Sequence, residues 1–237
     1  MSEHRNLGAM RWPELAARAP TLAIPLGATE QHGPHLPLRT DTAIAEELCI
    51  RLARRVPEVV VAPAVPYGAS GEHAEFPGTL SIGHEALRLL LVELVRSADH
   101  FAGVVLVNGH GGNLPTAHRA AALLRSEGRR VLVWSPDAPA DDSHAGGTET
   151  SAMLHLHPDE VAADAAAAGN TAPLPKLMDR LRAGGVRPVS PNGVLGDPTT
   201  ADATDGDAIL HRWTGSLARA VARWRRESSP PGPDIAG

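Results

Sequence analysis

The stretch GVVLVNGHGGN, residues 103–113, joins an apolar run to a glycine-rich turn and decides which fold the chain can adopt. The run GVVLV has the length and the β-branched content of a buried strand. A helical stretch follows over residues 115–126, with Pro115 suitably placed in its first turn. The order strand, turn, helix predicts one unit of an alternating α/β fold.

The same alternation extends outward on both sides of this stretch. Short apolar runs predict further buried strands over residues 21–27, 59–65 and 131–134. Apolar residues at helical spacing predict helices over residues 41–56, 85–96, from 148 onward, around 174–181 and over 207–226. Thr40 or Asp41 is the expected N-cap of the first of these helices. The pattern predicts a mostly parallel sheet with helices on both faces.

Length and composition fit one folded domain. The chain has 237 residues, of which 43% are hydrophobic and 21% are charged, close to the usual values for globular proteins. We expect a single domain over residues 1–227. The last segment, SSPPGPDIAG at residues 228–237, has almost nothing to bury and is expected to be a disordered tail.

Charge and cysteine content argue against several classes of protein. A formal net charge of −5 gives no basic surface for nucleic acid or an anionic membrane. No stretch approaches the roughly eighteen consecutive apolar residues of a transmembrane helix. The single cysteine, Cys49, cannot form an internal disulfide, and the first residues do not resemble a signal peptide. We therefore expect a cytoplasmic protein with neither nucleic acid nor a membrane as partner.

Three loops that follow predicted strands carry histidine, carboxylate or both. They lie within residues 30–41, 108–113 and 142–149. Because the carboxyl ends of parallel strands meet at one edge of a sheet, we expect side chains from these loops to converge in a ligand crevice. The candidate metal ligands are Glu30, His32, Asp41, His110 and Glu149, with His144 nearby.

The chemistry of this set indicates a metal centre. Oxygen and nitrogen ligands without sulfur suit Zn²⁺, Fe²⁺ or Mn²⁺. Five protein groups, one of them a carboxylate able to bridge, suit two divalent ions roughly 3.5–4 Å apart. Such ions would share a bridging hydroxide, because they lower the pKa of bound water to about 7, and one ion would polarise a carbonyl. The predicted reaction is amide hydrolysis, with His144 carrying a proton to the leaving amine.

Each motif also has a simpler interpretation. Asp41 alone could cap its helix, and Glu149 in a first helical turn is favoured by the helix dipole without any metal. The turn NGHGGN could be a phosphate cradle in a non-enzymatic phosphate- or nucleotide-binding module. The chain lacks a P-loop lysine pattern and a G-x-G-x-x-G fingerprint, which weighs against that module. His73 and Glu75, in the loop SGEHAEFPGT, could line the mouth of the site and touch substrate.

The segment EQHGPHLP at residues 30–37, followed by Asp41, resembles the hallmark of the creatininase family. NGHGGN at residues 108–113 and HAGGTET at residues 144–150 are similar to two further segments of that family. The resemblance implies a three-layer α/β/α sandwich with a mostly parallel central sheet, a dinuclear metal centre and assembly as a homo-oligomer. Carried over by position, the ligands are Glu30, Asp41 and His110 for one ion, and His32, Asp41 and Glu149 for the other.

One position departs from the family pattern. Creatininase has a glutamate ligand just after the histidine that matches His110, and this chain has Gly112 there. The difference argues against a simple creatinine hydrolase. It leaves Glu149 as the carboxylate for the second ion.

Four longer segments narrow the resemblance to the mycofactocin-system branch of the family. They are VPYGASGEHAEFPGTLSIG, HAGGTETSAMLHLHPDEV, AGNTAPL and SPNGVLGDPTTADATDG. This resemblance implies a peptidase whose substrate is a modified precursor peptide. It would release the C-terminal Val-Tyr-derived dipeptide after a radical enzyme has acted. The alternative is another amidohydrolase of the family, acting on a small cyclic amide or a formamide.

Overall fold

Four parallel strands form the central sheet of the computed structural model, which describes residues 6–16 and 19–227. They are hydrogen-bonded in the order β2-β1-β3-β4. Their bounds are Thr21–Leu26 for β1, Val59–Val61 for β2, Gly103–Asn108 for β3 and Val131–Trp134 for β4. The predicted parallel sheet is confirmed, and the tail predicted over residues 228–237 lies outside the described residues.

Strand β2 is shorter than the run predicted over residues 59–65. Pro25 of β1 has no backbone N–H to donate to this run, so the regular ladder of hydrogen bonds is interrupted beyond Val61. The backbone N–H groups of Ala62 and Val65 still donate to carbonyl oxygens of β1. The whole run therefore stays beside β1, although only its first part forms regular strand.

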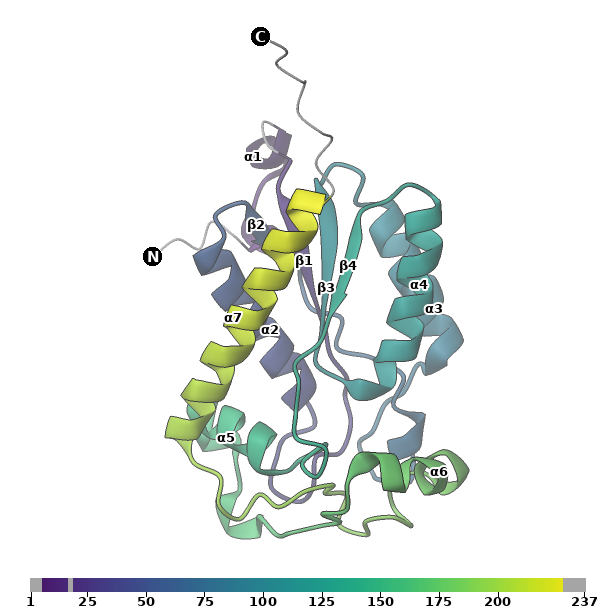
Figure 1. Cartoon of the computed structure of the whole chain (residues 1–237), viewed down its shortest axis with the longest axis vertical. Coiled ribbons are helices and arrows are strands. Elements are labelled where there is room, and N and C mark those ends of the chain that lie inside the picture. The colour runs from purple at the N-terminus through teal and green to yellow at the C-terminus, as the bar shows by residue number, and fades with distance from the viewer. Residues whose placement is uncertain (1–5, 17–18, 228–237) are drawn as a thin grey trace.

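Helices cover both faces of the sheet (Figure 1). Helices α2 and α7 cover one face, with α5 packed against them, and α3 and α4 cover the other. This is the predicted three-layer α/β/α sandwich. No helix in the described ranges is long and apolar enough to cross a membrane. The helices are α1 (Trp12–Ala16), α2 (Thr40–Arg55), α3 (Gly83–Arg96), α4 (Leu114–Ser126), α5 (Gly147–Leu156), α6 (Leu174–Gly184) and α7 (Ala203–Glu227).

Alternate residues of each strand enter two separate hydrophobic cores. Ile24 of β1 packs with α3 and α4, whereas its neighbour Ala23 packs with α2, α5 and α7. This follows from the two-residue period of a strand, which turns successive side chains to opposite faces. The last helix docks on the sheet as predicted, and the residues that it buries at helical spacing are Leu210, Trp213, Leu217 and Val221.

The start of α2 differs from the prediction that Thr40 or Asp41 caps this helix. The N-cap residue is Arg39, and it makes no side-chain capping hydrogen bond. Thr40 Oγ1 donates to Pro37 O at 2.7 Å. The carboxylate of Asp41 turns toward two histidines instead of the helix end. The capping prediction was wrong because contacts between distant loops outweigh the local preference.

The connections place a topological switch point at the carboxyl ends of β1 and β3. From β1 the chain crosses through α2 to β2, and from β3 it crosses through α4 to β4 at the opposite side of the sheet. The two connections leave neighbouring strands in opposite directions, and ligands of open α/β sheets bind at such a point. The segments 27–40 and 109–113 follow β1 and β3 at this switch point.

Candidate metal centre

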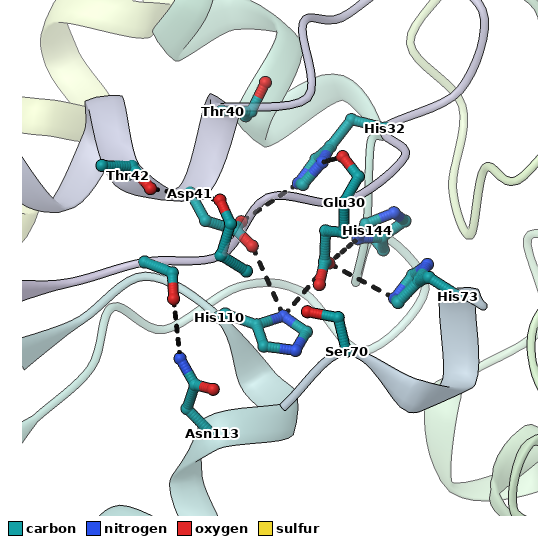
Figure 2. A network of polar contacts seen from close by, with 12 residues as sticks. Glu30, His32, Thr40, Asp41, Thr42, Ser70, His73, His110, Asn113 and His144 are labelled. Carbon is teal, nitrogen blue, oxygen red and sulfur yellow. Dashed lines mark hydrogen bonds and ion pairs between the residues drawn. The ribbon is translucent and has the colours of Figure 1, made fainter. Parts of the chain in front are cut away.

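The five predicted ligands lie together in one cluster at the carboxyl ends of the strands. Figure 2 shows four of them, which are at most 5% exposed: Glu30, His32, Asp41 and His110. The side chain of the fifth, Glu149, is 19% exposed. They come from the loops after β1 and β3 and from the first turns of α2 and α5, so the segments that follow β1, β3 and β4 converge as predicted.

Asp41 occupies the centre of this cluster. Its Oδ1 lies 3.0 Å from His32 Nε2, and its Oδ2 lies 3.4 Å from His110 Nδ1. Each oxygen of the carboxylate thus faces a different histidine, which is the arrangement that a bridging ligand needs. Gly109 permits this approach, since a Cβ there would lie 2.4 Å from Asp41 O. Only glycine lets the turn after β3 lie against the first turn of α2.

Two further carboxylates extend the cluster toward the two histidines. Glu30 Oε1 lies 3.1 Å from His110 Nδ1, and Glu30, Asp41 and His110 have ligand atoms close enough to hold one ion. Glu149 Oε2 lies 3.8 Å from His32 Nε2. It also accepts a hydrogen bond from the backbone N–H of Ala145 at 2.7 Å, which fixes the carboxylate at the start of α5.

The hydrogen bonding of these carboxylates fits bound cations. Both carboxylate oxygens of Glu30 and the Oδ2 of Asp41 are buried without a hydrogen-bond partner. A buried carboxylate oxygen that lacks a partner is costly, because it has lost water and gained nothing in exchange. Divalent ions coordinated by these oxygens and by the neighbouring imidazole nitrogens would remove that cost. The residues present therefore fit a pair of divalent cations.

The pKa values of the cluster residues also fit a site for cations. Burial alone would lower the pKa of His32, but Asp41 and Glu149 outweigh it and raise the pKa to about 10. Burial is likewise outweighed at His110, where Glu30 and Asp41 raise the pKa well above its usual value. Burial raises the pKa of Glu149 to about 7, and the charge of Asp41 adds to this rise. In the metal-free cluster the imidazoles hold protons that an incoming cation has to displace.

Two more histidines lie beside Glu30 of the cluster. His144 Nδ1 lies 3.8 Å from Glu30 Oε1, and burial together with His32 and His73 lowers the pKa of His144 well below its ordinary value. His73, expected at the mouth, is buried, and its Nε2 lies 3.3 Å from Glu30 Oε1 (Figure 2). Glu75, expected beside it, is exposed.

Glu72 was not among the predicted site residues, although its Oε1 lies 3.4 Å from His110 Nε2. Burial would raise the pKa of Glu72, but the hydrogen bond and charge of His110 lower it. The only signal in the sequence was its position directly before His73. Glu30, Asp41 and Glu72 thus place three carboxylates around His110 of the NGHGGN turn. Their negative charges would repel a phosphate. The phosphate-cradle interpretation is therefore disfavoured.

Gly112 is another position beside the cluster at which a side chain does not fit. A Cβ there would lie 2.4 Å from His110 Nε2, 2.5 Å from Glu72 Oε1 and 2.6 Å from Ala69 O. The space beside His110 is thus occupied by a carboxylate from the loop after β2. At the neighbouring Gly111, a Cβ would meet nothing within 4 Å.

We expect Gly112→Ala to weaken metal binding by about 10–100-fold, the usual effect of disturbing a group that orients a metal-bound histidine. The added methyl group has to displace His110 or the backbone of Ala69. Titration of the metal-free protein with Zn²⁺ measures the affinity. Gly111→Ala is the matched control and is expected to bind as the wild type does. Equal affinity of both variants would contradict the packing described here.

Comparison with known proteins agrees with this geometry. The family model "Creatininase: Creatinine amidohydrolase" matches residues 8–221. The mycofactocin precursor peptide peptidase of Mycolicibacterium smegmatis (strain ATCC 700084 / mc(2)155) is 50% identical over 227 residues, which is 93% of this chain and 92% of that protein.

Solved structures of creatininases share the fold. The structure titled "Creatininase Mn" has a TM-score of 0.77 and 29% identity, and the match covers 95% of this chain and 99% of that one. A mutant creatininase described as "Zn-Zn type" has a TM-score of 0.78 and 29% identity, covering 97% and 100%. The family model spans most of the chain and the fold agrees over nearly its whole length. The chain belongs to the creatininase family of amide hydrolases.

Proposed function

We propose that the chain is a metal-dependent peptidase that removes a modified, Val-Tyr-derived dipeptide from the C-terminus of a mycofactocin precursor peptide. The reaction type is carried by one observation, the buried oxygen and nitrogen cluster in which carboxylate oxygens lack hydrogen-bond partners. The substrate class is supported by 50% sequence identity, over almost the full length of both chains, to the peptidase of M. smegmatis.

The residues available for the two ions divide into two groups that share Asp41. Glu30, Asp41 and His110 would hold one divalent ion. His32, Asp41 and Glu149 would hold the other, and His144 also lies close to His32 and Glu149. Zn²⁺, Fe²⁺ and Mn²⁺ all suit these ligands, and solved relatives are described as Mn and Zn-Zn forms. When bound, such ions lower the pKa of water to about 7 and polarise an amide carbonyl.

A residue of the chain itself would carry the proton that the attacking water releases to the leaving amine. We assign this role to His144, because its Nδ1 faces Glu30 and its lowered pKa keeps the imidazole neutral and able to accept a proton. After accepting it, His144 would pass the proton to the leaving amine. Glu149 would contribute to catalysis by holding its ion beside His32, in a position that Ala145 N–H fixes.

Elemental analysis and a cleavage assay test this function together. Protein purified without added metal is expected to contain roughly two divalent ions per chain. It is expected to release the C-terminal dipeptide from the enzymatically modified precursor peptide, and to lose this activity on chelation. Creatinine and a formamide serve as comparison substrates. Cleavage of either of these in place of the peptide, or full activity in the chelated protein, would contradict the proposal.

We also propose that residues 1–227 form one domain, and that the chain acts in the cytoplasm as a homo-oligomer. The single Cys49 supports a reducing compartment, because it cannot form an internal disulfide. The family resemblance supports the oligomer. Sedimentation of the purified protein measures its mass in solution, and a monomer at all concentrations would contradict assembly.

A further inference from the structure

The side chain of Gln31 lies between the imidazoles of His73 and His144 and is only 5% exposed. Its Nε2 is 2.8 Å from His73 Nδ1, 3.0 Å from His144 Nε2 and 3.0 Å from Gly193 O. The two rings lie close to each other, with centroids 4.5 Å apart. One amide group therefore contacts His73 and His144, the two histidines beside the cluster that are not proposed as metal ligands.

Two backbone groups determine which way the amide of Gln31 points. Its Oε1 accepts a hydrogen bond from the N–H of Gly33 at 2.9 Å, and its Nε2 donates to Gly193 O. Rotating the amide by half a turn would place an N–H against the N–H of Gly33 and an oxygen against Gly193 O. The network thus assigns the amide nitrogen to the side that faces the imidazoles.

This orientation fixes the tautomer of His73. An amide NH₂ group only donates, so His73 Nδ1 has to accept and its ring proton sits on Nε2. Nε2 is the atom that lies 3.3 Å from Glu30 Oε1. A nitrogen that carries a proton cannot bind a metal ion. His73 therefore directs a protonated nitrogen toward Glu30 and is not free to bind an ion there, although Glu30, His73 and His144 lie close enough together to hold one.

The hydrogen bonds of His144 assign it the same tautomer as His73, with the proton on Nε2, but a different role. His144 Nε2 lies 3.0 Å from the same amide nitrogen, but both amide hydrogens go to His73 Nδ1 and Gly193 O, because His144 Nε2 itself has to donate to a carbonyl. His144 Nε2 lies 2.9 Å from the backbone carbonyl oxygen of Gln31, to which it donates. Its Nδ1 is left unprotonated and faces the cluster, 3.8 Å from Glu30 Oε1.

We propose that Gln31 is a positioning residue that gives the two neighbouring histidines different roles: His73 directs its Nε2–H toward Glu30, and His144 presents an unprotonated Nδ1 to the cluster. The assignment of the ring protons stands on hydrogen bonds alone. Its catalytic consequence rests on the proposed function, because it explains how His144 is kept ready to accept a proton.

Nitrogen NMR of histidine-labelled, metal-free protein tests the tautomers directly. In the wild type we expect His73 to show a protonated Nε2 and an unprotonated Nδ1. Gln31→Met keeps the length of the side chain and removes both donors, so His73 is expected to show a mixture of tautomers. His73→Asn identifies the signals by their loss. His84→Asn is the matched control, because His84 contacts Thr116 outside the cluster and its replacement is expected to leave the other signals unchanged.

Zn²⁺ titration and kinetics separate this inference from the proposed peptidase activity. On adding Zn²⁺, His32 and His110 signals are expected to show ligation while those of His73 do not. Gln31→Met is expected to keep its metal and to lose about 10–100-fold in kcat, with KM little changed. A protonated Nδ1 on His73 in the wild type, or its ligation by Zn²⁺, would overturn the inference. Failure to cleave the peptide would count against the proposed function and leave the tautomers standing.

Discussion

Asp41→Asn is expected to remove bound metal and catalytic turnover together. Asp41 is the one side chain whose two oxygens face both histidines of the cluster, at 3.0 Å from His32 and 3.4 Å from His110. Asparagine has nearly the same shape, but it is neutral and offers a single carbonyl oxygen. It therefore cannot bridge two cations, and both groups of ligands lose a member. We expect turnover to fall by at least about 10²–10³-fold, the effect of losing one strong electrostatic stabiliser.

Metal content by elemental analysis and peptide cleavage are the two measurements for this variant. Circular dichroism and a thermal melt establish that the variant is folded. Glu46→Gln is the matched control, since Glu46 is another carboxylate on α2 whose charge acts on Arg39 and Cys49 and not on the cluster. The control is expected to retain both metal and activity. An Asp41→Asn protein that keeps its full metal content would show that Asp41 is not the bridge.

The general position of the site was predictable because it depends on the strands. Apolar runs predict strands, and the carboxyl ends of parallel strands meet at one edge of the sheet. Loops that follow three different strands therefore had to approach each other. As a result His110 and Glu149 lie near Asp41, although each is more than sixty residues away from it in the sequence.

The contacts within the site were less predictable, because they depend on side chains from different loops. The local preference of Asp41 for a helix N-cap gave way to His32 and His110, which no local pattern brings near. Glu72 reaches His110 only because Gly112 leaves the space open. Gln31 sits between two recognisable ligands in the sequence, and its role depends on the backbone of Gly193. Sequence spacing shows none of these approaches.

His144→Ala is expected to keep its metal and to lose turnover, the opposite pairing to that of Asp41→Asn. His144 Nε2 is used by the backbone carbonyl of Gln31, while its Nδ1 faces the cluster from 3.8 Å. A group that only transfers a proton is not needed to hold the ions. Removing a general acid or base costs about 10²–10⁴-fold in rate, so kcat is expected to fall by that factor while metal content stays at the wild-type level.

Added imidazole distinguishes a lost proton carrier from a disturbed fold. A small imidazole that enters the space left by His144→Ala is expected to restore part of the rate, since it supplies the missing basic nitrogen. His118→Ala, on the exposed side of α4, is the control and is expected to show neither the loss nor the rescue. Ligand atoms of His144, His32 and Glu149 also lie close enough together to hold one ion. Loss of one metal ion from His144→Ala would therefore mean that His144 binds that ion, and the proton would need another carrier.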